Sequence, residues 1–421
     1  MSYSQQMLDA LEAGDIAQSR ELFTQVLAHD DDEHKYNLAG ELYALGFTGQ
    51  AQRLYEELMG KYPELEDIKT ALADIAVANG EPDRAINLLT SIAPDSDYYP
   101  QALLALADVY QTQGLYEVSE QKLLQAARLV PDEPVVTFAL GELYFDWGKD
   151  AQAQAAYQQL LAQGVDTMAG VSIQTRYAAT LANGGQYEDA VAQYEEVGVD
   201  ALDPTSAFRL GTLYLELKDT GRAITTLQRV IDADPSFANA YLPLAQAQAA
   251  ANQLEAASAT VTAGLAVDDT NPELFLVGAR LALRQSALDV AEGYLTRARA
   301  LDPENQTVML EWSNLLLAQG KDEANVAFLE ALDAADEVDP QVYWNLAKSY
   351  DRLDNVEKAR ENYLLAFRNF QDSADFLRDL IDFFQSTGAR PELRAALTRY
   401  LALVPDDDAM QARLDELDAE N

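Results

Sequence analysis

The chain has 421 residues, and its 70 acidic residues against 29 basic ones give a formal net charge of −41. A polyanion of this charge repels nucleic acid and anionic membranes, so we expect neither as a partner; the excess either only keeps the surface solvated or attracts basic partners. The chain has no cysteine, which excludes disulfides, thiolate zinc sites and cysteine nucleophiles.

The N-terminal segment MSYSQQMLDALEAGD has neither the basic region nor the apolar stretch of a signal peptide. No part of the chain approaches the roughly 18–20 uncharged apolar residues that a membrane helix needs. We therefore expect a cytoplasmic chain without membrane insertion.

Small residues recur with one period along most of the chain, which is the first sign of a repeat architecture. The interval is 34 residues in each of three series: Gly46, Gly80, Gly114 and Gly148; Ala39, Ala73, Ala107 and Gly141; and Ala223, Ala257 and Ala291. Two position classes that keep the same interval in phase make coincidence improbable, and they predict a repeated structural unit.

Each period predicts two amphipathic helices separated by a turn. Between residues 100 and 131, apolar residues recur at intervals of three and four and Gly114 interrupts them. A second apolar stripe then runs to Pro131, which a helix cannot contain in its interior. The first stripe is Leu103, Leu106, Ala107 and Tyr110, and the second is Leu115, Ser119, Leu123 and Ala126.

The period is interrupted in one place, where the fifth and sixth units lie 37 residues apart instead of 34. The intervening stretch, LLAQGVDTMAGVS, contains Gly164 and Gly170, and it is either a bend or a harmless insertion. We expect one array over 1–168 and another over 169–421, or one continuous superhelix with a bend near 162–171. Pro243 lies just inside a predicted helix, where a first turn tolerates it or the helix axis bends.

The period and its residues resemble the tetratricopeptide repeat (TPR) family, whose pattern is Leu-Gly/Ala, Tyr, Gly, Ala, a large residue, Ala and Pro. The clearest match is Leu140-Gly141, Tyr144, Gly148, Ala153 and Tyr157. The resemblance implies an all-α, right-handed solenoid of about twelve repeats that begin near residues 1, 32, 66, 100, 134, 171, 204, 238, 272, 306, 340 and 374. The end, DDDAMQARLDELDAEN, is predicted to be a capping helix. The layout is also similar to cytosolic TPR proteins of Gram-positive bacteria of the YpiA type.

The resemblance further implies a concave groove lined by the first helix of each repeat, at the fifth, sixth, ninth, twelfth and thirteenth positions of the period. We predict that this groove binds a protein or peptide partner. The predicted binding residues are Tyr36, Asn37, Tyr43, Phe138, Phe145, Arg176, Phe208, Arg209, Arg280, Arg284, Asn314, Trp344, Asn345 and Lys348. The same positions hold the acidic residues Asp74, Asp108, Glu142 and Asp146 in the N-terminal half, and the basic residues Arg352 and Arg378 in the C-terminal half.

Basic residues therefore gather in the C-terminal part of the predicted groove, although they are scarce overall. Acidic residues such as Glu311 and Asp379 occupy groove positions there too. The arginines therefore either pair internally or form a basic half that binds an acidic segment. The lysines of the family's carboxylate clamp are not reproduced, although Asn37 and Asn345 occupy the position of its asparagine.

Signs of catalytic chemistry are absent from the sequence. His29 and His34 are the only histidines, and their spacing of five does not place both rings on one helix face. No phosphate-binding loop or nucleophile elbow occurs. We expect no cofactor, no metal and no enzymatic activity. The leading hypothesis is a protein-binding scaffold or adaptor, and the alternative is a regulatory module that controls a partner enzyme or secretion component.

Overall fold

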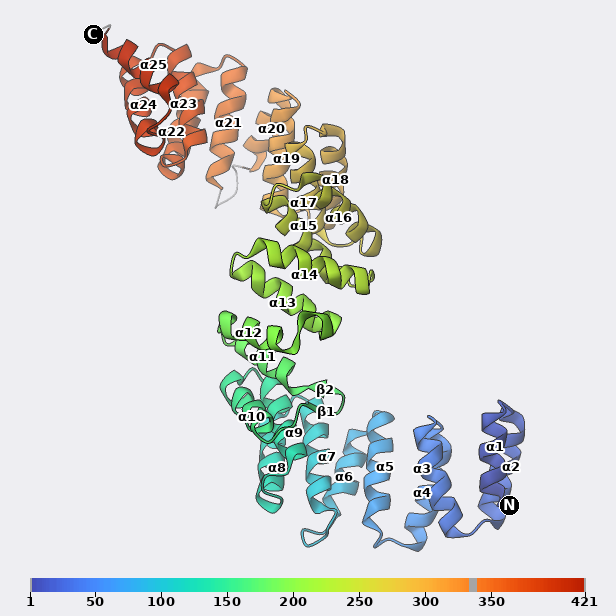
Figure 1. Ribbon diagram of the computed structural model, residues 1–421. Helices are drawn as coiled ribbons and strands as arrows, with labels where there is room; N and C mark the ends of the chain where they lie inside the picture. Colours follow the sequence, from blue (N-terminus) through green and yellow to red (C-terminus); the bar gives the residue numbers. More distant parts are fainter. Residues whose placement is uncertain (1, 333–338, 420–421) are drawn as a thin grey trace. The chain divides into compact units, whose positions relative to one another are not determined.

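The computed structural model describes residues 2–332 and 339–419, and within them helices alternate between two series (Figure 1). The first helix of each pair is called helix A. These are α1 (Tyr3–Glu12), α3 (Asp32–Ala44), α5 (Glu66–Ala78), α7 (Tyr99–Thr112), α9 (Pro134–Asp146), α11 (Ile173–Asn183), α13 (Pro204–Glu216), α15 (Tyr241–Ala250), α17 (Pro272–Arg284), α19 (Gln306–Ala318), α21 (Pro340–Arg352) and α23 (Ala374–Ser386).

The second helix of each pair, called helix B, packs antiparallel against its helix A. These are α2 (Ile16–His29), α4 (Thr48–Lys61), α6 (Pro82–Thr90), α8 (Tyr116–Leu129), α10 (Asp150–Ala162), α12 (Tyr187–Val197), α14 (Thr220–Ala233), α16 (Leu254–Val267), α18 (Leu288–Leu301), α20 (Asp322–Leu332), α22 (Val356–Phe370) and α24 (Arg390–Leu403). A last helix, α25 (Asp408–Ala419), packs on α24 and buries Met410 and Leu417.

The predicted all-α TPR solenoid is confirmed. Helices α3, α5, α9, α13, α17, α19, α21 and α23 begin at the residue where a repeat was predicted to start. Helix α15 begins at Tyr241 after a short 3-10 turn (Ala238–Ala240). Pro243 therefore lies in the first turn, where its missing N–H costs no intrahelical hydrogen bond. Among the helices of the described residues, none is both long and apolar enough to cross a membrane.

The chain divides into two compact units, Met1–Leu202 and Asp203–Asn421. The interruption of the period lies inside the first unit. There the strands β1 (Thr167–Met168) and β2 (Val171–Ser172) form a small antiparallel hairpin, with Ala169 and Gly170 in left-handed conformation at its tip. A 3-10 turn (Val199–Ala201) ends the first unit. The boundary expected at 168/169 thus coincides with a hairpin, and whether the chain bends there stays a prediction.

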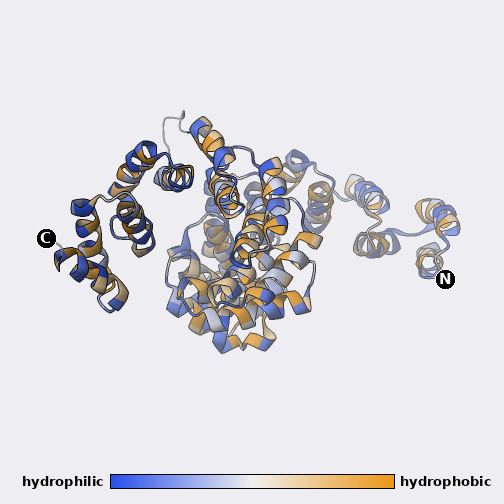
Figure 2. Cartoon of the chain, turned by 90° about the horizontal axis from the view of Figure 1, so that it is seen from above, coloured by the Kyte–Doolittle hydropathy of each residue, from blue (hydrophilic) through white to orange (hydrophobic). Residues whose placement is uncertain are grey.

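Small residues set the distance between helix A and helix B of each repeat. A Cβ atom added at Gly141 of α9 would lie 2.8 Å from Cε1 of Tyr157 on α10, and one at Gly211 of α13 would lie 2.7 Å from Cγ of Leu227 on α14. Since Tyr157 and Leu227 are fully buried, the small residue gives each large one its space. Figure 2 shows apolar and polar residues mixed around the helices, as expected when one stripe of each helix is buried.

The turn from helix A to helix B repeats one backbone conformation. Gly114 has a φ of +73°, and Leu115 N–H donates to Tyr110 O, which closes the end of α7. The equivalent bond in the second unit runs from Asp219 N–H to Tyr214 O, but its left-handed residue is Lys218, with a φ of +60°. A non-glycine residue pays a steric cost in this conformation.

We predict that Lys218→Gly stabilises the protein by about 0.5–1 kcal/mol, because glycine adopts the left-handed conformation without strain from a Cβ atom. Lys218→Ala removes the same charge but keeps the Cβ atom, so it should bring no gain and serves as the control. Chemical denaturation followed by circular dichroism measures both. If the two substitutions stabilise equally, the effect comes from the lost charge and the strain argument is wrong.

Candidate partner-binding surface

The A helices make the inner face within each unit. Successive A helices touch one another, as α5 and α7 do in the first unit and α17, α19 and α21 do in the second. Within the described residues, successive B helices have at most sparse contacts with one another. Because each row of helices curves toward the side on which neighbours lie closer, the positions predicted for binding lie on the inner, concave side of each unit.

Most of these positions in the second unit are bonded to one another across neighbouring repeats. The ninth position of one helix A contacts the sixth position of the next helix A, which in this unit lies 31 residues later, and we call this series the inter-repeat ladder. Its pairs are Arg280 Nε to Glu311 Oε1 (2.6 Å), Asn345 Nδ2 to Asn314 Oδ1 (2.9 Å), Lys348 Nζ to Asp379 Oδ2 (3.1 Å) and, on the capping helix, Arg413 Nη1 to Asp382 Oδ1 (3.0 Å).

Other predicted cations of the second unit also have internal partners. Arg284 donates to Ala249 O and Asn252 Oδ1 at the end of α15, and Arg352 donates to Leu317 O at the end of α19. These carbonyls are among the acceptors that a helix leaves unsatisfied at its C-terminus. The contacts support internal pairing of the arginines, while binding of an acidic segment by them stays a prediction.

The predicted aromatic anchors are largely packed as well. Trp344 donates from Nε1 to Asp379 Oδ2 at 2.9 Å and contacts the rings of Phe370 and Phe376. Phe208 contacts Phe237, with ring centroids 5.3 Å apart. Arg209, beside Phe208 on α13, is partly buried. Their burial favours a structural role for these aromatic side chains.

One pair of the inter-repeat ladder lies in the first unit. Arg176 Nη2 is 3.0 Å from Glu142 Oε2, and Tyr157 donates its hydroxyl to Glu142 Oε1 at 2.5 Å. The Arg176 guanidinium lies 5.1 Å from the ring centroid of Phe145, and Phe138 packs partly buried nearby. Burial and the neighbouring Glu142 raise the pKa of Tyr157 far above its ordinary value. This end of the first unit is thus closed by its own side chains.

Toward the N-terminus the predicted residues are more open. Asn37 is exposed on α3, and Tyr36 contacts Tyr55 edge-on with ring centroids 5.9 Å apart. A hydrogen bond to Asp67 and burial raise the pKa of Tyr36 to about 12, so its hydroxyl stays neutral. Tyr36 and Asp67 line a cavity of about 300 Å³ between α3, α4 and α5.

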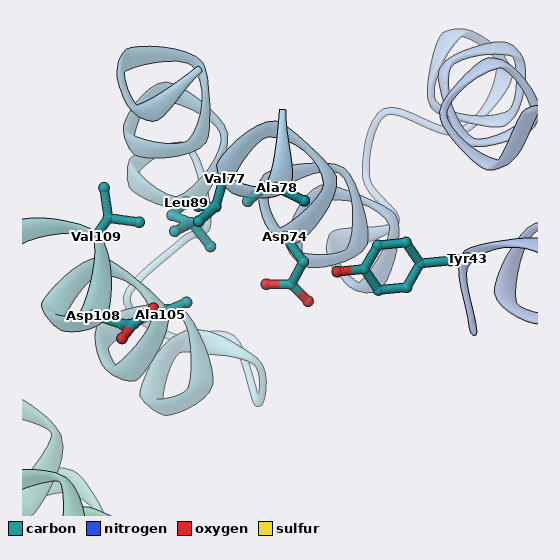
Figure 3. A pocket seen from close by; sticks show the side chains of 9 residues that line it. Tyr43, Asp74, Val77, Ala78, Leu89, Ala105, Asp108 and Val109 are labelled. Carbon is teal, nitrogen blue, oxygen red and sulfur yellow. The ribbon is translucent and has the colours of Figure 1, made fainter. Parts of the chain in front are cut away.

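A second cavity, which we call the acidic cleft, lies between α5 and α7 and reaches α3. It has a volume of about 290 Å³ and is lined by Tyr43, Ala73, Asp74, Val77, Ala78, Leu89, Ala105, Asp108 and Val109. Figure 3 shows the Tyr43 hydroxyl pointing toward the Asp74 carboxylate, with Asp108 on the neighbouring helix. Within the described part of the chain, neither carboxylate has a hydrogen bond or an ion pair to a side chain.

The pattern of positions found Tyr43, Asp74 and Asp108 and includes Val77 at a twelfth position, but it missed the other two residues of the apolar wall. Val77 is exposed on α5, Val109 is buried on α7, and Leu89 lies on the helix B α6. Their shared cleft depends on how three repeats stack. The only signal in the sequence is the 34-residue interval between Asp74 and Asp108, which places two like charges on equivalent turns.

The electrostatics of the acidic cleft are visible in one group. Burial raises the pKa of Asp74 above its ordinary value of 3.8, and the nearby Asp108 carboxylate raises it further. The raised pKa means that the folded state favours the protonated form, so Asp74 loses part of its contribution to stability as the pH rises through that pKa. Two carboxylates without a counter-charge are a cost that a bound cation would relieve.

We predict that Asp108→Asn lowers the pKa of Asp74, because it removes the like charge and leaves only the effect of burial. The carboxyl ¹³C resonance of Asp74, followed across the acidic pH range in aspartate-labelled protein, measures the shift. Asp289→Asn on α18 in the second unit changes the net charge equally and should leave the pKa of Asp74 in place. An unchanged pKa of Asp74 in Asp108→Asn would show that the charge of Asp108 does not act on Asp74.

The two histidines lie on different helices, His29 at the end of α2 and His34 in the first turn of α3, where Asp31 raises the pKa of His34 by hydrogen bonding. Within residues 2–332 and 339–419, no group of three or more histidine, aspartate or glutamate side chains is placed to hold a metal ion.

Comparison with known protein families finds tetratricopeptide repeats along most of the chain. Residues 111–165 match the family described as "YpiA-like, tetratricopeptide repeats", and residues 340–407 match its C-terminal repeats. General tetratricopeptide models match residues 214–281 and 276–340. The match to residues 5–114 is to the "Tetratricopeptide repeat protein 21 ARM repeat".

The chain is 31% identical over 403 residues to the "TPR repeat-containing protein YpiA" of Bacillus subtilis (strain 168), covering 95% of this chain and 94% of that protein. It is 26% identical over 188 residues to "Tetratricopeptide repeat protein 21B" of Mus musculus, of which it spans 14%. Among solved structures, "Crystal structure of APC/C hetero-tetramer Cut9-Hcn1" is 12% identical with a TM-score of 0.49, covering 98% of this chain and 95% of that one.

Proposed function

We propose, on the premise that the chain belongs to the YpiA-like family of tetratricopeptide repeat proteins, that it binds an extended segment of a partner protein along the A helices of the first unit. A tetratricopeptide solenoid is a protein-interaction scaffold in general, since stacked repeats present a long continuous surface. The place on that surface and the form of the ligand are the proposal. Absence of enzymatic activity, a cytoplasmic location and a regulatory role stay predictions.

The acidic cleft carries this proposal. It runs from Tyr43 in one repeat to Asp108 two repeats later, so it crosses three consecutive A helices. Neighbouring helices lie roughly 8–10 Å apart, and an extended chain advances about 3.3 Å per residue. A segment of about five or six extended residues would therefore cross the cleft and contact side chains of all three helices.

The second unit is less suited to this role because several of the predicted binding residues on its A helices are bonded to one another. A partner that bound at Arg280 or Lys348 would have to displace Glu311 or Asp379. In the first unit, Asn37, Val77 and Asp108 are exposed along α3, α5 and α7. An exposed surface with polar side chains and an apolar wall offers a peptide both hydrogen bonds and apolar contacts.

The test is site-directed photo-cross-linking in the native host. A photoreactive residue replaces Val77, in the acidic cleft, or Gln121, exposed on helix B α8 of the same unit. We expect one partner protein to cross-link from position 77 and not from position 121, and to bind the purified chain directly. A partner that cross-links only from position 121, or that needs a third protein to bind, would contradict the proposal.

A further inference from the structure

The inter-repeat ladder gives a rule for the inner face, and the acidic cleft departs from it. Where a polar group stands at the ninth position of a helix A and another at the sixth position of the next, the described pairs are bonded, from Glu142–Arg176 to Asp382–Arg413. Asp74 and Asp108 also occupy the ninth position. Their partners by register are Ala105 and Ala139, which have nothing to donate.

We infer that the acidic cleft receives a lysine or arginine side chain from the partner segment, so that the partner supplies the cation that Ala105 does not. This inference rests on the proposed function and names the chemistry of its ligand. The cation would take the place of the guanidinium that Arg176 brings to Glu142 two repeats further along the chain. Charge complementarity selects the occupant, since two like charges flank the cleft.

The shape of the acidic cleft fits a long basic side chain. Asp74 and Asp108 provide carboxylate oxygens on neighbouring helices, and the Tyr43 hydroxyl lies on the side of Asp74 (Figure 3). Val77, Leu89 and Val109 offer an apolar wall to the methylene groups of the stem. A volume of about 290 Å³ is at the lower end of the roughly 300–1,000 Å³ of ligand pockets, which suits one side chain.

The overall charge supports a basic partner but does not select this site. A net charge of −41 attracts any cationic peptide over a distance set by salt. The test must therefore separate the acidic cleft from the general field. Two variants of the first unit that add one positive charge each, one in the acidic cleft and one on an exposed position of a helix B, change the general field by the same amount.

Ala105→Arg on α7 places a guanidinium opposite Asp74 and thereby imitates the Glu142–Arg176 pair, so the fold should be kept. Gln121→Arg adds the same group at an exposed position of helix B α8, away from the lining of the acidic cleft. Circular dichroism and the denaturation midpoint verify that both variants fold.

The probe is a peptide selected on the full-length chain from a random library of about ten residues, long enough to span roughly 30–35 Å when extended. Its affinity is measured at an ionic strength of about 0.15 M, where the general field is screened beyond about 8 Å. We expect the selected peptides to share a lysine or arginine. Replacing that residue by norleucine, which keeps the stem without the charge, should weaken binding at least about tenfold.

The variants then assign that cation to the acidic cleft. Ala105→Arg should weaken binding of the selected peptide at least about tenfold and abolish its preference over the norleucine peptide, whereas Gln121→Arg should keep both. If a peptide binds α3, α5 and α7 with the same affinity after its basic residue is replaced by norleucine, the inference is overturned and the proposed function still stands. If no peptide binds the first unit, the proposed function itself fails. Equal losses in both variants would show that only the general field attracts the peptide.

Discussion

Phe376→Ala should lower the free energy of unfolding by about 3–5 kcal/mol, the range for removing a buried aromatic ring. Phe376 is fully buried on α23, and its ring lies 5.4 Å from Trp344 and 5.9 Å from Phe370, centroid to centroid. The substitution therefore leaves a cavity between two consecutive repeats. Since each repeat of a solenoid is stabilised by its neighbours, the last repeats should unfold first.

Chemical denaturation measures this effect by two signals. Circular dichroism follows the whole chain, and tryptophan fluorescence includes Trp344, which touches the lost ring. Leu365→Ala on α22 removes a side chain that is 40% exposed, so it should change stability by less than about 1 kcal/mol. A similar cost for both variants would mean that the aromatic cluster around Phe376 is not a packed core.

Gly141→Leu should destabilise the first unit by about 1–3 kcal/mol through overpacking. The Cβ atom alone would lie 2.8 Å from the Tyr157 ring, and a leucine adds three more carbons. Tyr157 cannot move freely, because it is fully buried and its hydroxyl bonds to Glu142. Disturbing this tyrosine would also disturb the Glu142–Arg176 pair of the inter-repeat ladder.

The matched control for this substitution is Gly60→Leu near the end of α4 in the same unit. An added Cβ atom there meets nothing within 4 Å, and leucine has the higher helix propensity. Gly60→Leu should therefore be neutral or slightly stabilising in the same denaturation experiment. If Gly141→Leu is as harmless as Gly60→Leu, the assignment of small residues to the contact between helix A and helix B is wrong.

Much of the fold could be predicted from the sequence because its rules are local and repeated. Gly141 and the alanines mark the contact inside each repeat, and the 34-residue interval places the start of α9, α17 and α23 at the observed residue. The left-handed turn was visible where it falls on Gly114. It was not visible at Lys218. Lysine disfavours this conformation, and the packing of the two helices imposes it there.

The hairpin of β1 and β2 was not predicted either. Its two-residue strands are too short to show an alternating pattern, and only Gly170 marked the place. The sequence showed an interruption of the period, but it could not distinguish a bend from an inserted hairpin. The outcome depends on which backbone groups of residues 167–172 form hydrogen bonds with one another.

The candidate site was predicted as a list of positions but not as a set of contacts. The helical positions named Arg280, Asn314 and Lys348, which the structure places on consecutive A helices. Which residue each would contact depends on the displacement between repeats, which pairs the ninth position with the sixth position of the next repeat. Once this register is known, the presence of Ala105 opposite Asp74 shows that the next repeat supplies no basic partner for this carboxylate.

The most direct test of the account is hydrogen exchange of the full chain, measured by mass spectrometry with and without the partner that cross-links from position 77. The account predicts slower exchange on binding in α3, α5 and α7, in segments that include Tyr43, Asp74 and Asp108. Helices α4 and α8 of the same unit should change little. Protection confined to the B helices or to the second unit would contradict the claim that the A helices of the first unit bind the partner.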